Sequence, residues 1–383
     1  MAGGTTGDRT SLWRQPAMRA LAASTALGFA SYFLTLASLP AYAVAGGADA
    51  DIAGLVTAVF LTVTIVVQSV VPVLTARFGV GPVLAVGLVA LGAPAPLYVV
   101  DDGLVWLSAI AVVRGAGFGV LTVLGATLAA QVAPVERRGE AIGLYGLGIA
   151  VPNLLAVPAG VALVLDGQVA WLAWLAASPV LALPLVPGLV RAVRAEPAGG
   201  TSSRAAALAA LAPSVVLLVV TLAGGGVVTF LPIERPDGAL ATVALLLFGL
   251  TGAVTRWQAG LLADRVGTRR LMPLSLLVGA LGMALVALGL IAGDAWILVG
   301  AAVFGAGFGA VQNLTLVTAF ARAGEGGATA ASAMWNASFD AGTAAGALAL
   351  GLVAAGIGLD WTFVAVAVLL VVTLPVARVA TRT

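Results

Sequence analysis

Long apolar stretches recur along the whole 383-residue chain, and short polar segments separate them. The hydrocarbon core of a membrane is about 30 Å thick, which an α-helix of about 20 apolar residues can cross. Windows of this kind predict six segments in the first half, at 17–40, 53–74, 81–100, 104–130, 140–165 and 169–190. Six more follow at 212–232, 239–260, 271–291, 295–320, 327–356 and 360–378. The pattern therefore predicts an all-α membrane protein with twelve transmembrane helices.

The first segment also has features of a secretory signal. Arg14 and Arg19 precede its apolar run, and Ala41-Tyr42-Ala43 is similar to a signal-peptidase site. The run is longer than the 7–15 apolar residues that are typical of a cleaved signal. We therefore predict an uncleaved signal anchor.

The charged residues predict the orientation of the helices. Acidic residues dominate the loops after odd-numbered segments, where Arg235 is the one arginine: Asp49, Asp51, Asp101, Asp102, Asp166, Glu234, Asp237, Asp294 and Asp360. Arginines dominate the other loops and both tails: Arg9, Arg14, Arg77, Arg137, Arg138, Arg191, Arg194, Arg204, Arg265, Arg269, Arg270, Arg322, Arg378 and Arg382. The positive-inside rule then predicts a multi-pass protein of the cell membrane with both termini in the cytoplasm. One missed helix would invert the alternation, so the charges support the count of twelve.

The composition excludes several classes of protein. Hydrophobic residues make up 61% of the chain and charged residues 9%, against about 25% charged residues in a soluble domain. A soluble enzyme, a nucleic-acid-binding protein and a disordered chain are therefore excluded. The chain contains neither cysteine nor histidine, which excludes disulfides, thiolate or histidine metal sites and a histidine proton relay. We expect no metal and no cofactor.

The chain divides into two similar halves. The polar stretch from Arg191 to Arg204 contains proline, glycine and serine and predicts a flexible linker instead of a helix. We expect a bundle over residues 1–196, a cytoplasmic linker over 197–204 and a second bundle over 205–383. Gly115-Ala-Gly-Phe-Gly119 recurs as Gly305-Ala-Gly-Phe-Gly309, 190 residues later. The loop after the second segment also matches the loop after the eighth, 188 residues later, so the two bundles are predicted to be a duplication.

These repeated motifs resemble those of the major facilitator superfamily. The loop signature G-x-x-x-D-R-x-G-x-R-R is matched by Gly260, Asp264, Arg265, Gly267, Arg269 and Arg270. In the first-half copy Pro72 and Ala76 replace the glycine and the aspartate, while Arg77 and Gly79 remain. Arg114 and the glycines after it are similar to the fourth-helix motif of the family. The runs Phe230-Leu-Pro232 and Asp340-Ala-Gly342 resemble bacterial efflux-type members, among them drug and arabinose exporters.

The resemblance implies two pseudo-symmetric six-helix bundles around a central cavity, with a cytoplasmic gate at the inner loops. Gate residues would be Arg77, Gly260, Asp264, Arg265, Gly267, Arg269 and Arg270. Asp264 is expected near the start of the fifth helix, at Arg138 to Ala141, because a helix N-terminus attracts a carboxylate. Ala76 cannot form the equivalent contact, so an asymmetric gate is expected. Arg256, two turns before Asp264, is either a second gate residue or a side chain that snorkels to the membrane surface.

Asp340 is the only acidic residue well inside a predicted helix. At about 1.5 Å per residue it lies near the membrane midplane, where an ionised carboxylate is costly. We therefore predict that Asp340 binds and releases a coupling proton. Asn336 is a candidate hydrogen-bond partner, and Arg114 is a candidate counter-ion. The alternative is a structural aspartate that bonds a neighbouring helix and never titrates.

Several other polar residues lie at mid-segment depth and are candidates for the substrate cavity: Tyr32, Arg114, Asn153, Gln312, Asn313, Trp335 and Asn336. An arginine near the midplane indicates function unless its guanidinium bonds backbone carbonyls between helices. For the amides, hydrogen bonding between helices is the alternative.

The sequence contains no GxxxxGK[ST] nucleotide-binding motif and no cluster of a nucleophile with a base. It therefore predicts no enzyme but a secondary transporter that moves a small organic molecule by alternating access. The resemblance favours proton-coupled efflux of an amphipathic compound. One alternative is proton-coupled transport of a small polar metabolite or sugar, and another is a transporter-like receptor or lipid scramblase. The expected partners are the substrate, protons and the lipid bilayer, with no nucleic acid and no obligate protein partner.

Overall fold

Twelve helices are long and apolar enough to cross a membrane, as the hydrophobic pattern predicts. They lie in a computed structural model that describes residues 11–36, 38–48, 54–192, 203–234 and 239–382, and these residues contain no strand. The spans are Pro16–Ala45, Leu55–Phe78, Val80–Val99, Leu104–Val132, Val135–Leu165, Val169–Ala192, Leu211–Leu231, Leu240–Val266, Thr268–Ala292, Asp294–Ala323, Ala328–Ile357 and Leu359–Ala380. The eighth span continues six residues beyond its predicted end and so includes Asp264.

Some spans are single helices and others are broken. The single helices are α4 (Leu55–Phe78), α6 (Leu104–Val132), α11 (Leu211–Glu234), α12 (Ala239–Val266), α13 (Thr268–Ala292), α14 (Asp294–Ala323) and α15 (Ala328–Ile357). The fifth span begins with η3 (Val135–Arg137) and continues as α7 (Arg138–Leu165). The broken spans combine α1 (Pro16–Leu36) with α2 (Ser38–Ala45), α5 (Val80–Gly92) with η2 (Ala95–Val99), and α16 (Leu359–Val372) with α17 (Leu374–Ala380). The sixth span combines α8 (Val169–Ala176), η4 (Ser178–Leu185) and α9 (Val186–Ala192).

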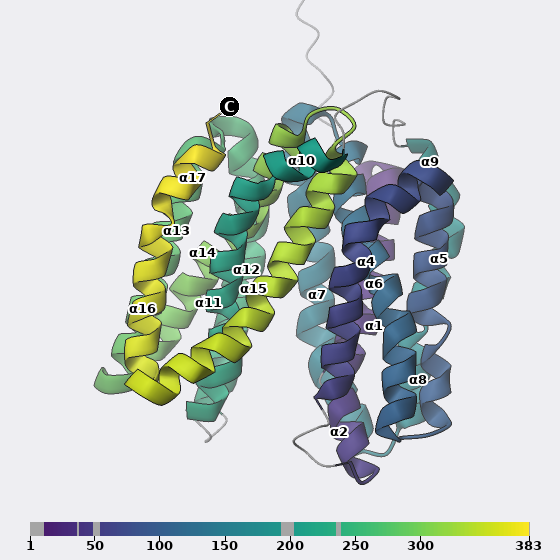
Figure 1. Cartoon of the computed structure of the whole chain (residues 1–383), viewed down its shortest axis with the longest axis horizontal. Coiled ribbons are helices and arrows are strands. Elements are labelled where there is room, and N and C mark those ends of the chain that lie inside the picture. Colours follow the sequence, from purple (N-terminus) through teal and green to yellow (C-terminus); the bar gives the residue numbers. More distant parts are fainter. Residues whose placement is uncertain (1–10, 37, 49–53, 193–202, 235–238, 383) are drawn as a thin grey trace, which may run out of the picture.

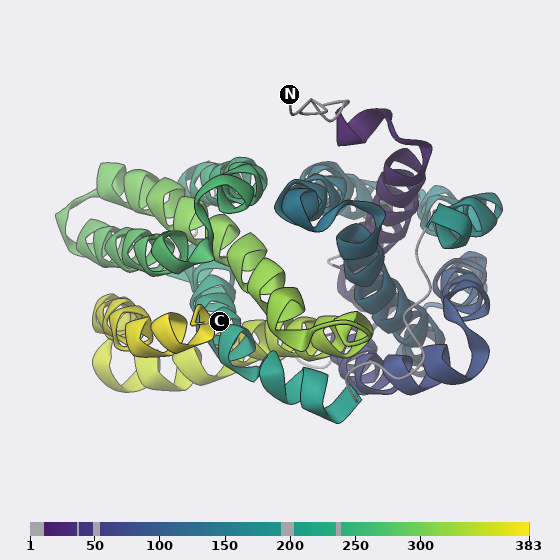
Figure 2. The same ribbon diagram turned by 90° about the horizontal axis from the view of Figure 1, so that it is seen from above.

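The helices form two bundles side by side, α1 to α9 in one and α11 to α17 in the other (Figure 1). The start of α1 and the end of α17 lie toward the same end of the bundles, seen from above in Figure 2. We call this end the arginine-rich end, because the helix ends there carry Arg77, Arg138, Arg191, Arg265, Arg322 and Arg378. We call the opposite end the aspartate end, because Asp101, Asp102, Asp166, Asp294 and Asp360 lie there.

The expected flexible linker is partly helical. Arg191 belongs to α9, and Arg204 belongs to α10 (Ser203–Ala209), so the prediction of a linker without helix was wrong at both ends. Alanine and arginine favour helix, and they dominate the α10 sequence. Residues 193–202 lie outside the described residues, so the bundle boundaries at 196 and 205 stay predictions. Arg9, Asp49, Asp51, Arg194, Arg235 and Asp237 also lie outside them, as does the Glu234 side chain.

Glycines bring the helices within each bundle into backbone contact. In α6, the first and last glycines of Gly115-Ala-Gly-Phe-Gly119 abut the backbone of α4, and the middle one abuts α5. In α14, the first and last glycines of Gly305-Ala-Gly-Phe-Gly309 abut α12, and the middle one abuts α13. The two copies of the motif thus make equivalent contacts in their own bundles, as a duplication predicts.

Threonine hydrogen bonds repeat in the same way. The Thr64 hydroxyl donates to the Gly115 carbonyl oxygen at 3.0 Å, and the two residues are 51 apart in the chain. The Thr255 hydroxyl donates to the Ala306 carbonyl oxygen at 2.9 Å, with the same separation of 51. Each bond joins the second helix of its bundle to the fourth. The superposition of Arg77 on Arg265 stays a prediction.

The loop motif places glycine where the backbone requires it. Gly79, between α4 and α5, has φ +82°, and Gly267, between α12 and α13, has φ +77°. Side chains with a Cβ rarely adopt this region, so each glycine permits the chain to reverse between two long helices. The first-half motif has kept this property although it lacks the aspartate.

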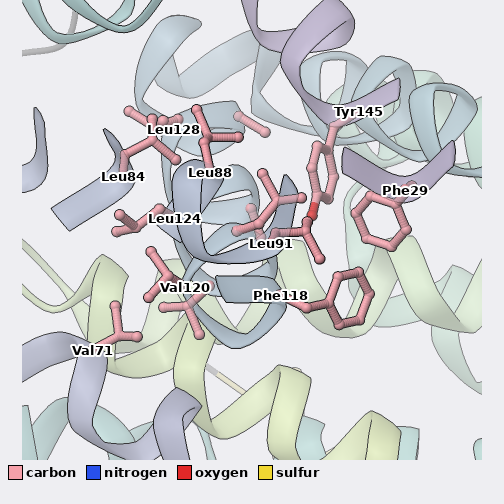
Figure 3. Packing of buried hydrophobic residues seen from close by; sticks show 14 of the residues in the cluster. Phe29, Val71, Leu84, Leu88, Leu91, Phe118, Val120, Leu124, Leu128 and Tyr145 are labelled. Carbon is pink, nitrogen blue, oxygen red and sulfur yellow. The ribbon is translucent and has the colours of Figure 1, made fainter. Parts of the chain in front are cut away.

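Apolar side chains fill the space between the helices. Leu84, Leu88 and Leu91 of α5 are buried and lie beside Leu124 and Leu128 of α6 (Figure 3). Lipid tails are as apolar as these side chains, so shape complementarity holds such helices together more than burial does.

Replacement of Gly309 by alanine should destabilise the second bundle, because the new Cβ would meet the Gly252 carbonyl oxygen. Overpacking of this kind costs about 1–3 kcal/mol. Gly249→Ala is the matched control, because a Cβ there meets nothing within 4 Å. Thermal unfolding in detergent, followed by tryptophan fluorescence, should show a lower Tm for Gly309→Ala and no loss for Gly249→Ala. Equal Tm values would contradict the packing role.

Candidate functional site

The two bundles meet at two crossings, α7 with α12 and α14, and α15 with α4 and α6. Helices at bundle interfaces are where secondary transporters place substrate sites and moving contacts. The polar residues at these crossings are therefore the candidates for function.

Three glycines of α7 form the first crossing. Gly139 and Gly260 are in backbone contact, so α7 and α12 touch without any side chain between them. Further along α7, Gly143 abuts Trp257 and Gly146 abuts the Arg256 side chain. A larger residue at Gly139 would force the bundles apart, because its Cβ would meet the Gly260 backbone.

Asp264 bonds the first turn of α7 across this crossing. Its carboxylate oxygens accept hydrogen bonds from the Gly139 and Glu140 backbone N–H groups, both at 2.8 Å. These N–H groups have no partner inside the helix, and the helix dipole favours an anion at that point. The predicted position of Asp264 at the start of the fifth helix is confirmed. The amide of Asn313 adds a bond at 3.3 Å from its Nδ2 to the Gly139 carbonyl oxygen.

Arg256 is buried at the same crossing without a carboxylate partner. Only 8% of it is exposed, and its Nη1 donates to the Gln312 Oε1 at 2.9 Å. Its Nε is buried and has no hydrogen-bond partner. An unpaired donor on a buried cation is costly, so Arg256 has capacity for one more acceptor.

Asp340 lies at the second crossing and joins the two bundles. Its Oδ2 accepts a hydrogen bond from Gln68 Nε2 of α4 at 2.8 Å. Gln68 is fully buried, and its Nε2 also bonds the Thr122 hydroxyl at 3.2 Å. The Gln68 Oε1 is buried and has no partner. The partner of Asp340 is thus a neutral amide, and neither candidate partner, Asn336 or Arg114, takes that place.

Two further residues of α15 continue the polar contact. The Ser332 hydroxyl donates to the Val123 carbonyl oxygen at 2.7 Å. The Asn336 Nδ2 donates to the Ser332 carbonyl oxygen at 2.9 Å and to the Thr122 carbonyl oxygen at 3.4 Å. Ser332, Asn336 and Asp340 are spaced by four, so they share one face of α15. This face, which we call the α15 polar face, binds α4 and α6 of the other bundle.

Tyr32 belongs to an aromatic cluster near Asp340. Its ring stacks on Phe118 at 4.2 Å and on Phe60 at 5.4 Å between centroids. The Tyr32 hydroxyl lies within electrostatic range of the Asp340 carboxyl group. Tyr32 lines a small recess together with Thr35, Leu36, Leu39, Val56, Thr57, Phe60 and Ala111.

Arg114 is bonded inside the first bundle. It is fully buried, and its nitrogens donate to the Leu91 carbonyl oxygen, the Thr35 and Tyr98 hydroxyls, and both Ser31 oxygens. All five guanidinium donors are therefore used. This geometry matches the alternative of a structural bond between helices, and it leaves no donor for a substrate.

The remaining predicted site residues lie in different parts of the molecule and form no common site. Trp335 is buried in the second bundle, where its indole donates to the Thr315 hydroxyl at 3.0 Å. Asn153 is exposed near the middle of α7. Exposed arginines at the arginine-rich end are Arg77, Arg265, Arg269 and Arg270. The last two line a cavity between α13 and α17, outside the α7–α12 crossing.

The sequence model described as "Major Facilitator Superfamily" matches residues 21–332. The chain belongs to the major facilitator superfamily. No curated protein sequence matches it significantly. The superfamily is one of transporters, so the chain is a multi-pass membrane transport protein.

Solved structures of superfamily transporters have the same fold. The human organic anion transporter MFSD10 (TETRAN) has a TM-score of 0.77 at 15% identity, over 94% of this chain and 99% of that one. FucP in its outward conformation has a TM-score of 0.76 at 15% identity, over 97% and 100%. The N162A form of FucP, the fucose:proton symporter of E. coli, has a TM-score of 0.72 at 15% identity, over 96% and 98%.

Sequence reasoning missed Gln68 and Ser332. Gln68 has the same signal as the predicted amides, a polar side chain in an apolar segment. Nothing in the sequence indicates that it pairs with a residue 272 positions away. Ser332 is small and common in membrane helices, so its sequence context does not distinguish it.

Asp264→Asn should open the α7–α12 crossing. The substitution replaces the charged carboxylate by a neutral amide. The amide NH₂ group is a donor that would face a backbone N–H group, at a cost of about 1.5–3 kcal/mol. The chain has no cysteine, so Ser332→Cys gives a single buried reporter at the interface. Labelling of this cysteine by a water-soluble maleimide should accelerate in the Asp264→Asn background.

Thr373→Cys is the control, because Thr373 is buried between α16 and α17, away from both crossings. Its labelling should stay slow with or without Asp264. An unchanged rate at Ser332→Cys would contradict the prediction that loss of the Asp264 charge is enough to open the interface.

Proposed function

We propose that this protein is a proton-coupled exporter of a small amphipathic organic molecule, which works by alternating access with its arginine-rich end in the cytoplasm. The hydrogen bond between Gln68 and Asp340 is the observation that carries the proposal, because it joins a titratable group to the contact between the bundles. The cross-bundle bonds of Asp264, Ser332, Asn336 and Asp340 lie in the parts of the helices toward the arginine-rich end. Beyond them the bundles diverge toward the aspartate end (Figure 1). This arrangement fits a state that is closed to the cytoplasm.

Protonation of Asp340 would strengthen its bond to Gln68. The carboxylate accepts one hydrogen bond from the amide and leaves the Gln68 Oε1 without a partner. A protonated carboxyl has an O–H donor, which can bond that oxygen while its other oxygen still accepts from Nε2. Acid and amide then form two hydrogen bonds instead of one. A proton taken from the outside would stabilise this state, and separation of α15 from α4 would release it.

The environment of Asp340 favours a carboxyl group that gains and loses a proton over a carboxylate that stays ionised. Its hydrogen bond comes from a neutral amide, and among the described residues Asp340 forms no ion pair. Buried carboxylates without a cation favour the protonated form. Arg114, which would hold the carboxylate ionised, is saturated by other acceptors.

The cross-bundle contacts also weigh against the other functions. A receptor or a scramblase without a coupled cycle has no need of a titratable group in the contact between bundles. Transport of a sugar or small polar metabolite favours a cavity with many hydrogen-bonding groups, whereas the surroundings of Tyr32 are mainly aromatic and aliphatic. An amphipathic substrate suits this surface better.

The unpartnered Nε of Arg256 supports the inference that the substrate carries a hydrogen-bond acceptor or an anionic group. This nitrogen lies between the bundles, so movement of α7 away from α12 would uncover it toward the arginine-rich end. A guanidinium binds carboxylates and phosphates through paired hydrogen bonds. An amphipathic anion would thus meet a cation on the cytoplasmic side and an apolar surface near Tyr32.

Asp340→Asn should abolish transport driven by a pH gradient. The protein would be placed in liposomes with a panel of fluorescent lipophilic anions and cations, and substrate-dependent proton flux would be followed with a pH-sensitive dye. The variant should lose proton flux and concentrative transport while it retains substrate exchange, because asparagine cannot carry the proton. Asp360→Asn, at the start of α16, is the control and should behave as the wild type. Normal coupling in Asp340→Asn would place the coupling site elsewhere.

Arg256→Gln tests the charge of the substrate. The variant keeps hydrogen-bonding ability but removes the cation, so the KM for anionic members of the panel should rise by about tenfold. Cationic members should be unaffected or improved. Equal effects on both charge classes would assign Arg256 to the gate alone.

A further inference from the structure

A cavity outside both crossings opens at the arginine-rich end of the second bundle. Its volume is about 490 Å³. Arg269, Arg270 and Pro273 of α13 line one side, and Arg378, Thr381 and Arg382 at the end of α17 line the other. The two helices are in contact there and lie side by side in Figure 1. The volume is within the range of about 300–1,000 Å³ that is typical of small-ligand sites.

The four arginines of this cavity have no acidic partners. Among the residues that the structure describes, none of the four guanidinium groups forms an ion pair. Four like charges around one cavity repel each other, and the repulsion is relieved by a bound anion. The guanidinium donors therefore point to a ligand with several anionic oxygens.

The end of α17 does not need these arginines for its own stability. Arg322 of α14 already donates to the Ala380 carbonyl oxygen at 3.2 Å and the Arg382 carbonyl oxygen at 3.0 Å. Thr381 bonds the Ala377 carbonyl oxygen at 3.0 Å within its own helix. Capping of the helix end thus falls to Arg322 and Thr381. Arg378 and Arg382 are free to bind something else.

We propose that this cavity, the α13–α17 arginine pocket, binds a phosphate-bearing anion, with an inner-leaflet phospholipid headgroup as its source. Arginine binds phosphate oxygens through two parallel hydrogen bonds, and basic pockets between transmembrane helices suit anionic headgroups. Leu274, next to Pro273, is 58% exposed, and Val379, next to Arg378, is 50% exposed. Acyl chains can lie along these side chains while the headgroup occupies the pocket. A free phosphate would use the same arginines but gain nothing from this apolar rim.

The test compares a pocket variant with a variant of equal charge. Arg270→Gln/Arg378→Gln removes one arginine from each wall. Arg19→Gln/Arg191→Gln removes two exposed arginines of the first bundle. Purified full-length protein would be exchanged into micelles that contain phosphatidylglycerol or phosphatidylcholine. Native mass spectrometry would count the retained lipids, and thermal unfolding would be measured with each lipid and with inorganic phosphate.

Wild type and the Arg19/Arg191 variant should retain phosphatidylglycerol over phosphatidylcholine, and the pocket variant should retain about tenfold less. A stabilisation by inorganic phosphate that depends on the same arginines, without lipid preference, would support the site and assign it to a free anion. Equal lipid and phosphate responses in both double variants would overturn the proposal. Arg269→Gln/Arg382→Gln replaces the first pocket variant if that protein fails to fold. The site does not depend on the proposed transport cycle.

Discussion

Close backbone contact between helices is the constraint on which the rest of this structure depends. In a membrane the hydrophobic effect does little to bring helices together, because lipid tails contact apolar side chains as favourably as another helix does. Helices then associate through packing at short range, and glycine permits the closest approach. Glycine contacts of this kind have two roles in this protein. Gly119 and Gly309 fix helices within the bundles, whereas Gly139 and Gly260 bring the two bundles together. The first kind of contact should persist through a transport cycle, and the second has to open.

The buried charges differ in how completely the protein satisfies them. Arg114 gives all five donors to oxygen atoms of its own bundle, so it stabilises one fixed arrangement. Arg256 uses one donor on Gln312 and keeps a buried Nε free. Asp340 accepts from a neutral amide whose oxygen is itself unsatisfied. A buried polar group without a full set of partners is costly, and such cost is tolerated where another state or a ligand completes the bonding. Incomplete hydrogen bonding, more than burial, distinguishes the two charges that we propose to be functional from Arg114.

Duplication gave both bundles the same helix contacts but different polar chemistry at their crossings. The α7–α12 crossing is held by a carboxylate on a helix N-terminus, which is an anion–dipole contact. The α4–α15 crossing is held by the α15 polar face, which contains Asp340, the residue that we propose to bind the coupling proton. The position of the first-half aspartate is occupied by Ala76. In the proposed cycle the first crossing is the lock and the second responds to protons, and both have to separate for the interface to open.

The sequence by itself determined the twelve spans, the duplication, the loop motif and the position of Asp264 at the start of α7. These features follow from local apolar length, from glycine spacing and from repeated motifs, which need no knowledge of distant residues. Only the tertiary structure decided which residues the buried charged side chains bond. Asp340 bonds Gln68, and Arg114 turns inward to its own bundle, because hydrogen bonds between helices depend on helix rotation and crossing. It also gathered arginines from two separate segments, Arg270 and Arg378, around one cavity. No periodicity within a helix encodes such a meeting, since it arises only when neighbouring helices pack.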